Sequence, residues 1–149
     1  MTFQAKIGHA HLKVRDLERA VEFYERALNL RVNDRWGEQY VFLTGTEMHH
    51  EIALQRVGAH APQPPAGAIG LFHVAFEVPS RSAFAAALRH LRGEGIEVAV
   101  VDHVGISWAM YFNDPDNNGL EIYWDTRKGD LSARWTGNRP LPDVEIFAP

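Results

Sequence analysis

Two segments of the chain alternate apolar with polar side chains and then change to a helical pattern. The first runs from Gly8 to Asp16 and the second from Phe72 to Ser80. Strict alternation is typical of a strand with one buried face, and Asp or Ser at its end is a common N-cap of a following helix. We therefore predict a strand in each segment, followed by amphipathic helices over 17–30 and 82–91.

These two segments begin an internal repeat. His9 falls on His73 at a shift of 64 residues, and the same shift aligns the two helix caps. Farther along the chain, the run 50–54 matches the run 120–124 at a shift of 70 residues. Each half is then predicted to be βαβββ, and halves with short antiparallel strands would curl into incomplete barrels that pack together. The predicted fold class is α+β, with two tandem βαβββ modules around a shared cleft.

The predicted organisation is one domain that contains two modules, a linker and a tail. The linker is rich in Pro and Gly, which resist regular structure. The tail is too polar and too often interrupted by proline to predict another layer. Its Trp135 and the run 144–147 could pack over a barrel, cover the cleft or meet a second subunit. The predicted boundaries are the domain 1–149, module one at about 7–57, the linker 58–70, module two at about 71–125 and the tail 126–149.

Strand parity predicts three metal-binding side chains on the inner face of the cleft. Apolar residues alternate after His9, so His9 should face the other side, and the repeat extends this assignment to His73. Glu121 lies between two apolar neighbours and should share that side. Two imidazoles and one carboxylate form a 2-His-1-carboxylate site with open positions, which suits Fe(II) or Mn(II). Glu51, the repeat partner of Glu121, is a candidate fourth ligand, and His50 should then face the helix unless a strand end or bulge re-aims it.

The composition limits the other classes of function. Hydrophobic residues make up 46% and charged residues 23%, as in an ordinary globular protein. The net charge of −4 argues against nucleic acid and anionic membranes as partners. With 0 Cys and 8 His, any metal site must use imidazole and oxygen ligands. Because the chain has no long apolar run and no recognisable leader segment, we expect a cytoplasmic protein with a small-molecule partner.

Three runs, in this order and spacing, carry a resemblance to a known family. The runs 9–28, 72–78 and 111–125 resemble the vicinal oxygen chelate superfamily of glyoxalase I, bleomycin and fosfomycin resistance proteins, and extradiol dioxygenases. The resemblance covers roughly residues 7–126. It implies a homodimer or larger homo-oligomer, and it implies a metal bound by the matching positions, which are His9, His73 and Glu121.

Residues outside this triad favour one reaction within the superfamily. The run 47–54 resembles the extradiol dioxygenase segment that carries an acid–base histidine, which implies this role for His50. His103 and Tyr111 fall where that family places further residues near the substrate. The resemblance thus implies an enzyme that cleaves the ring of a catechol-type diol with dioxygen, using Fe(II) or alternatively Mn(II). Aromatic candidates for the substrate-binding wall are Trp108, Phe112 and Tyr123.

Two alternatives remain open. A glyoxalase-like isomerase or lyase would use four ligands, with Glu51 added to the triad, and Ni(II) or Zn(II) in place of iron. A non-catalytic protein would only sequester a drug or metabolite, as bleomycin resistance proteins do. Such proteins typically lack the full triad, so the presence of His9, His73 and Glu121 counts against pure sequestration.

Overall fold

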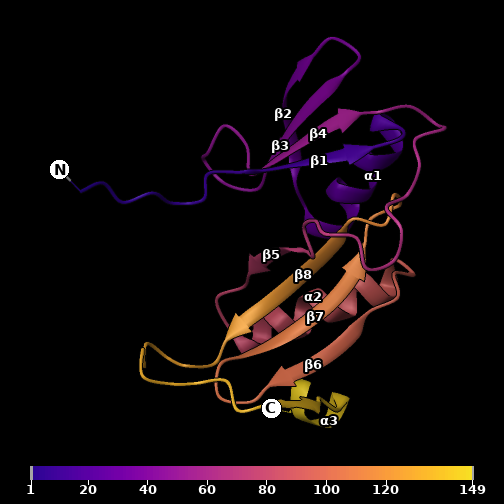
Figure 1. Cartoon of the computed structure of the whole chain (residues 1–149). Coiled ribbons are helices and arrows are strands. Elements are labelled where there is room, and N and C mark those ends of the chain that lie inside the picture. The colour runs from indigo at the N-terminus through magenta and orange to yellow at the C-terminus, as the bar shows by residue number, and fades with distance from the viewer. Residues whose placement is uncertain (1, 149) are drawn as a thin grey trace. The chain divides into compact units, whose positions relative to one another are not determined.

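The computed structural model describes residues 2–148, which form two compact units (Figure 1). The first unit comprises the residues up to Gly70 together with Asp114–Asp116. The second comprises Leu71–Asn113 and the residues from Asn117 onward. Each unit is built on one β-sheet. In the described part of the chain, every helix is too short or too polar to cross a membrane.

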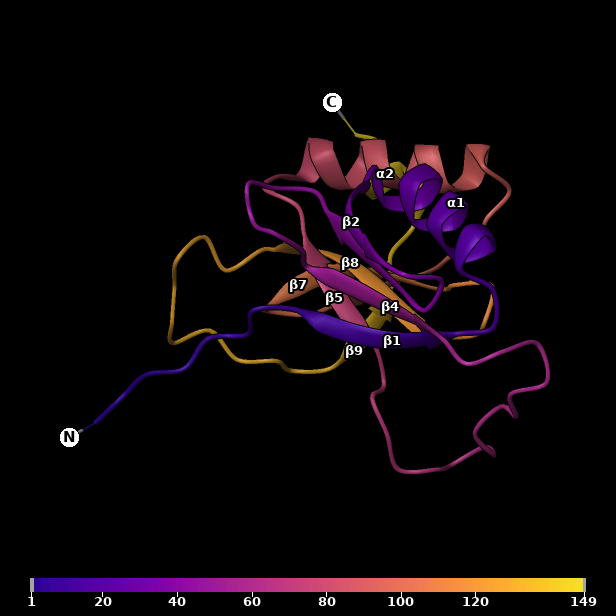
Figure 2. The same ribbon diagram turned by 90° about the horizontal axis from the view of Figure 1, so that it is seen from above.

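The first unit has the predicted order βαβββ. Its sheet has the strand order β1-β4-β3-β2, in which β1 is parallel to β4 and the other pairs are antiparallel. The helix α1 covers one face of this sheet (Figure 2). The elements are β1 (Ala10–Val14), α1 (Leu17–Leu28), β2 (Arg31–Trp36), β3 (Tyr40–Thr44) and β4 (Ile52–Arg56).

The second unit repeats this order and extends it. Its sheet has the order β5-β8-β7-β6-β9, with β5 parallel to β8 and the remaining pairs antiparallel. The α+β prediction with two βαβββ modules is therefore confirmed, and each sheet is curved but open. The elements are β5 (Val74–Glu77), α2 (Arg81–Gly93), β6 (Ala99–His103), β7 (Ser107–Asn113), β8 (Gly119–Asp125), β9 (Asn138–Pro140) and α3 (Asp143–Ile146).

Both long helices begin at the predicted caps. An Asp16 carboxylate oxygen accepts a hydrogen bond from the backbone N–H of Arg19 at 2.9 Å. The Ser80 hydroxyl accepts one from the backbone N–H of Ala83 at 3.1 Å. The helix α1 ends two residues earlier than its apolar pattern predicts, because Asn29 adopts the left-handed conformation with φ of 53°.

The tail forms structure that its composition did not predict. Asn138–Pro140 adds the strand β9 to the free edge of β6, and the short helix α3 follows it. Strand pairing uses backbone groups, so a polar segment can join an existing edge without an apolar face of its own. The tail also buries Leu141 and Ile146, which are 6% and 2% exposed.

The turn after β7 packs with α1 through two buried carboxylates of the first unit. Asp116 accepts hydrogen bonds from the backbone N–H of Arg15 at 2.9 Å, from the Arg15 guanidinium at 3.1 Å and from Arg19 at 2.6 Å. The Tyr24 hydroxyl donates to Asp114 at 3.1 Å. Burial, together with the charge of Asp114, raises the pKa of Tyr24 far above its usual value. The turn segment therefore has a structural role in the first unit.

Candidate functional site

One face of the second sheet carries three of the predicted site residues. Tyr111 lies opposite Glu121 in the β7–β8 pair, and Ser107 lies opposite His103 in the β6–β7 pair. Because residues directly opposite one another, and alternate residues of one strand, share a face, His103, Tyr111 and Glu121 lie on the same side of the sheet.

His73 and Glu121 meet on this face. His73 lies directly before β5, and its Nε2 is 2.7 Å from Oε2 of Glu121, which is 7% exposed. The buried Nδ1 of His73 has no hydrogen-bond partner among residues 2–148. A buried carboxylate beside an imidazole with an unsatisfied nitrogen is a donor set that suits a divalent cation. These two residues therefore fit the predicted metal.

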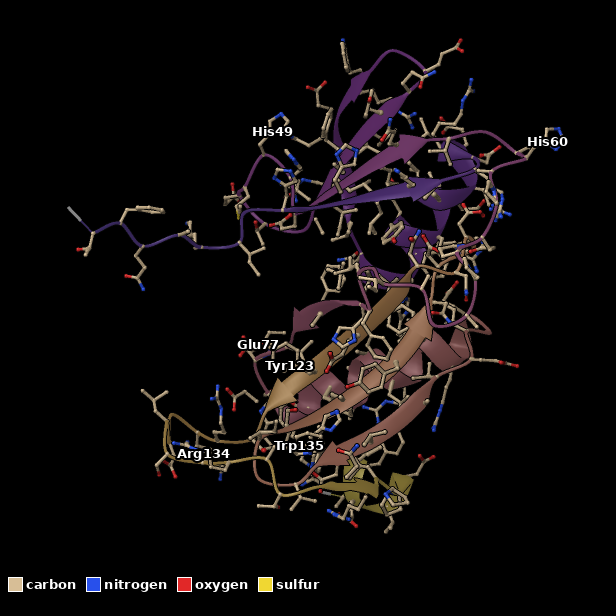
Figure 3. All side chains as sticks on the ribbon, viewed as in Figure 1. His49, His60, Glu77, Tyr123, Arg134 and Trp135 are labelled. Atoms are coloured by element: carbon tan, nitrogen blue, oxygen red, sulfur yellow. The ribbon has the colours of Figure 1, made fainter. Side chains whose placement is uncertain are left out.

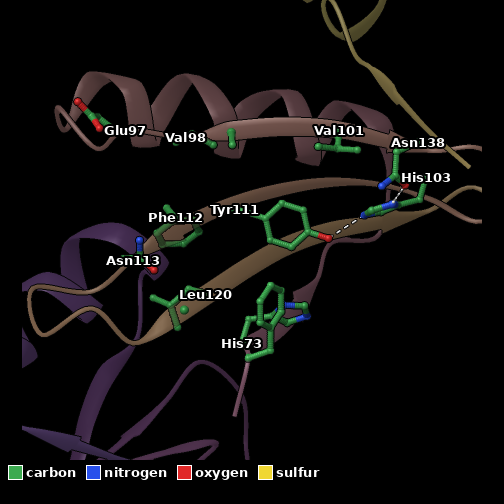
Figure 4. A pocket seen from close by; sticks show the side chains of 13 residues that line it. His73, Glu97, Val98, Val101, His103, Tyr111, Phe112, Asn113, Leu120 and Asn138 are labelled. Carbon is green, nitrogen blue, oxygen red and sulfur yellow. Dashed lines mark hydrogen bonds between the residues drawn. The ribbon is translucent and has the colours of Figure 1, made fainter. Parts of the chain in front are cut away.

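Tyr111 connects this pair to His103. Its hydroxyl is 2.7 Å from Nε2 of His103 (Figure 4). It is also 3.4 Å from Oε1 of Glu121. Burial, reinforced by the negative charge of Glu121, raises the pKa of Tyr111 to about 12. The hydroxyl is therefore neutral at ordinary pH and available as a hydrogen-bond donor.

The same face borders a cavity of about 750 Å³ within the second unit (Figure 4). A volume of this size accommodates a small aromatic molecule. Its polar lining includes His73, His103 and Tyr111. The larger apolar residues among those that line it are Phe72, Val98, Val101, Phe112 and Leu120.

The three aromatic residues predicted to bind substrate lie in different places. Phe112 is among the lining residues of the cavity. Trp108 belongs to the opposite face, where its ring centroid is 6.1 Å from that of Phe84 on α2. The Tyr123 hydroxyl donates to Glu77 at 3.1 Å, and both side chains lie near the outer end of β8 (Figure 3).

The remaining predicted residues belong to the first unit. The ring of His50 lies 4.4 Å from that of His9 and 5.0 Å from that of Phe42. Burial lowers the pKa of His50, and the neighbouring imidazoles of His9 and His49 lower it further. Within either unit, the described residues bring no three His, Asp or Glu side chains together as a metal site. His73 and Glu121 belong to the second unit, and His9 belongs to the first.

Glu51 has different partners from its repeat partner Glu121. Its carboxylate accepts a hydrogen bond from the backbone N–H of Gly45 at 3.1 Å and a short one from the Thr46 hydroxyl. Burial alone would raise the pKa of Glu51, but these hydrogen bonds outweigh it and hold the pKa below its usual value. Because β4 begins only at Ile52, strand parity does not apply to His50 and Glu51.

One residue beside the predicted site was not predicted from the sequence. Asn138, on β9, places its side-chain oxygen 2.6 Å from Nδ1 of His103. It lies in the tail beyond the repeat, so no matching position in the first half points to it. Asn138 is nevertheless among the residues that line the cavity.

Two curated relatives are dioxygenases. The chain is 33% identical over 143 residues to a protein named catechol-2,3-dioxygenase from Bacillus subtilis (strain 168), covering 94% of this chain and 48% of that protein. It is 30% identical over 126 residues to biphenyl-2,3-diol 1,2-dioxygenase 3 from Rhodococcus globerulus, covering 84% of this chain and 66% of the relative. The chain thus spans about half to two thirds of the length of these relatives.

The fold is shared with solved structures and with a family model. A lactoylglutathione lyase from Agrobacterium tumefaciens superposes with a TM-score of 0.65 at 21% identity, covering 86% of this chain and 98% of that one. At this identity the similarity concerns the fold alone. A sequence model of the Glyoxalase/Bleomycin resistance protein/Dioxygenase superfamily matches residues 6–122. The chain therefore belongs to the glyoxalase/bleomycin resistance protein/dioxygenase superfamily.

Proposed function

We propose that this protein is a metal-dependent extradiol dioxygenase that cleaves the ring of a catechol-type aromatic diol with dioxygen. The observation that carries the proposal is the contact series from His103 through Tyr111 to Glu121, beside an apolar cavity. The similarity to two diol dioxygenases supports the same reaction class.

The proposed metal ligands are His9, His73 and Glu121, with Fe(II) as the first candidate and Mn(II) as the alternative. The fit of His73 and Glu121 rests on their 2.7 Å contact and on the unsatisfied Nδ1 of His73. A divalent metal held by these residues would supply Lewis acidity toward the two oxygens of the diol.

The protein residues then have separate tasks. Val101, which pairs with Ala109 on the sheet face that carries Tyr111, would contact the aromatic ring. The neutral hydroxyl of Tyr111 would accept a hydrogen bond from a hydroxyl of the diol through its oxygen. His50 is the proposed acceptor of a diol proton, because its ring lies against that of the proposed ligand His9. His103 would hold the Tyr111 hydroxyl in place.

The glyoxalase-like alternative is less well supported. It requires Glu51 as a fourth ligand, and both carboxylate oxygens of Glu51 already accept hydrogen bonds from their own loop. The predicted homodimer or larger assembly and the predicted cytoplasmic location stay predictions.

The experiment that tests the proposal is anaerobic loading of the full chain with Fe(II), followed by a panel of catechols. The panel contains catechol, 3-methylcatechol and 2,3-dihydroxybiphenyl, so that the preferred size of the ring substituent emerges from the same measurement. We expect oxygen uptake equal to the amount of yellow ring-opened product, and none with Zn(II) in place of Fe(II). Stoichiometric binding of Fe(II) without oxygen uptake on any diol would overturn the proposal.

A further inference from the structure

The tail is held tightly against the end of β6, where His103 lies. The β6–β9 pair places Asn138 directly opposite His103. The pairing continues beyond the strands, since the backbone N–H of Val104 donates to Gly137 at 2.9 Å and that of Thr136 donates to Val104 at 3.0 Å. The backbone on both sides of Asn138 and His103 is therefore fixed by hydrogen bonds.

Gly105 permits this close approach. It has φ of 95°, a conformation that side chains disfavour, and a Cβ there would lie 2.4 Å from the carbonyl oxygen of Arg134. Both the backbone conformation of this turn and the short distance to Arg134 thus require glycine at position 105. Glycine in the turn after β6 therefore allows the tail to pack against that turn.

The hydrogen-bond donors determine the orientation of the Asn138 amide. The indole N–H of Trp135 can only donate, and its hydrogen is shared between the carbonyl oxygen of Gly137 at 2.9 Å and, at 3.0 Å, the Asn138 side-chain atom that faces His103. That atom must therefore be the amide oxygen, since the amide nitrogen could not accept. The oxygen is also 2.6 Å from Nδ1 of His103, so Nδ1 must carry a hydrogen and donate it.

This requirement extends to Tyr111. When Nδ1 carries the hydrogen of the neutral ring, Nε2 is an acceptor and lies 2.7 Å from the Tyr111 hydroxyl. A phenol has one hydrogen, so Tyr111 then donates to His103 and not to Glu121, from which it is 3.4 Å away. In the opposite tautomer, Nε2–H would donate to Tyr111 and turn the phenol hydrogen toward Glu121.

The structure assigns Asn138, oriented by Trp135, as a positioning residue that sets the tautomer of His103 and thereby the direction of the Tyr111 hydroxyl. The assignment of the His103 tautomer rests on contacts within this chain alone. Only its effect on catalysis rests on the proposed dioxygenase function. The tail thus acts on the cavity from a segment that has no counterpart in the first module.

The tautomer is measured directly on the metal-free full chain. Long-range proton–nitrogen spectra of protein labelled with ¹⁵N-histidine, recorded at about pH 8, distinguish a protonated from a bare ring nitrogen, and a His103→Gln variant identifies the His103 signals. We expect hydrogen on Nδ1 in the unmodified chain. Asn138→Leu should shift His103 toward the Nε2–H tautomer, Trp135→Phe should shift it partly, and Asn138→Asp should keep Nδ1–H because a carboxylate still accepts.

Activity supplies the second measurement. In the Fe(II)-loaded protein, Asn138→Leu should lower kcat for diol cleavage about tenfold with KM changed less than about twofold, and Asn138→Asp should restore most of kcat. Ser132→Ala, a tail variant outside this network, should leave kcat unchanged.

The outcomes separate the two proposals. Hydrogen on Nε2 in the unmodified chain, or an unchanged tautomer in both Asn138→Leu and Trp135→Phe, would overturn the inference whatever the activity. A shifted tautomer with unchanged kcat would overturn its catalytic part. If the unmodified chain oxidises no diol, the proposed function fails, and the spectra still decide the role of Asn138.

Discussion

Glu51 and Glu121 match in the sequence repeat, yet they differ in place and in partners, since Glu121 lies within β8 opposite Ala75 and Glu51 lies before β4. Glu121 lies 2.7 Å from the imidazole of His73 on the inner face of its sheet. Glu51 accepts its hydrogen bonds from Gly45 and Thr46 in the preceding loop. The two carboxylates therefore differ in surroundings, since one lies beside an imidazole and the other is bound by its own loop.

This difference gives a matched pair of variants. Glu121→Gln should weaken Mn(II) binding about 100-fold or more, since it removes a charged ligand, whereas Glu51→Gln should change it less than about threefold. Titration calorimetry with Mn(II) measures both. Equal losses in the two variants would restore Glu51 as a fourth ligand and favour the glyoxalase-like alternative.

His50 should be separable from metal binding. His50→Ala removes the proposed proton acceptor but no proposed ligand, so Mn(II) affinity should stay within about threefold while diol cleavage falls about 100-fold. Calorimetry and oxygen uptake on the same preparation test the two statements. A loss of metal on this substitution would instead make His50 a ligand.

Asp116 should contribute strongly to stability. Asp116→Asn leaves the guanidinium groups of Arg15 and Arg19 without their shared buried carboxylate, and we expect the free energy of unfolding to fall by about 2 kcal/mol. Asp125→Asn breaks the exposed pair with Arg127 and should cost less than about 1 kcal/mol. Urea denaturation compares the two variants, and equal costs would contradict the difference in burial.

The Asp116 carboxylate should also make the free energy of unfolding depend on pH. Burial alone would raise the pKa of Asp116, but hydrogen bonds from Arg15 and Arg19 outweigh it, so the pKa in the folded protein is lowered. Its stabilising effect is therefore complete above the unfolded-state value of about 3.9 and is lost as the pH falls through the folded-state value. Urea denaturation between about pH 5 and pH 2 should show the stability difference between the unmodified chain and Asp116→Asn shrinking with acid. A difference that grows with acid would contradict this assignment.

Gly119 should tolerate no side chain. A Cβ at this position would lie 2.3 Å from the carbonyl oxygen of Phe72, next to His73. Because a backbone atom cannot move aside easily, Gly119→Ala should cost about 1 to 3 kcal/mol of unfolding free energy and displace His73. Gly93→Ala, where a Cβ meets nothing within 4 Å, is the control. Urea denaturation and the histidine ring signals measure the two effects, and a neutral Gly119→Ala would show that β5 can shift freely.

The sequence predicted those parts of the fold that depend on local patterns. Asp16 and Ser80 are recognisable caps because they stand between an alternating segment and a helical one. The βαβββ order follows from the same alternation and from the repeat. The predicted end of α1 was less exact. The helix ends where Asn29 adopts the left-handed conformation, and the apolar pattern does not change at that residue.

Strand parity applies to side-chain direction only within regular strands. Tyr111 and Glu121 lie in paired strands, so parity puts them on one face. His50 and Glu51 lie before β4, where hydrogen bonds from Thr46 and Gly45 decide the side-chain direction instead. Asn138 contacts His103 across 35 positions of sequence, and no repeat or periodicity predicts a contact of that kind.

The strand β9 also affects how the second sheet can meet other chains. A free strand edge is a template for pairing with another molecule, and β9 replaces the five-residue edge of β6 with a three-residue edge that ends in Pro140. In the first sheet, the edge strand β2 is instead interrupted between Val32 and Asp34 and carries charged side chains. The two modules thus resist edge-to-edge aggregation by different means. In the second unit, the tail segment that shortens the free edge of the sheet is therefore the same one that contacts His103.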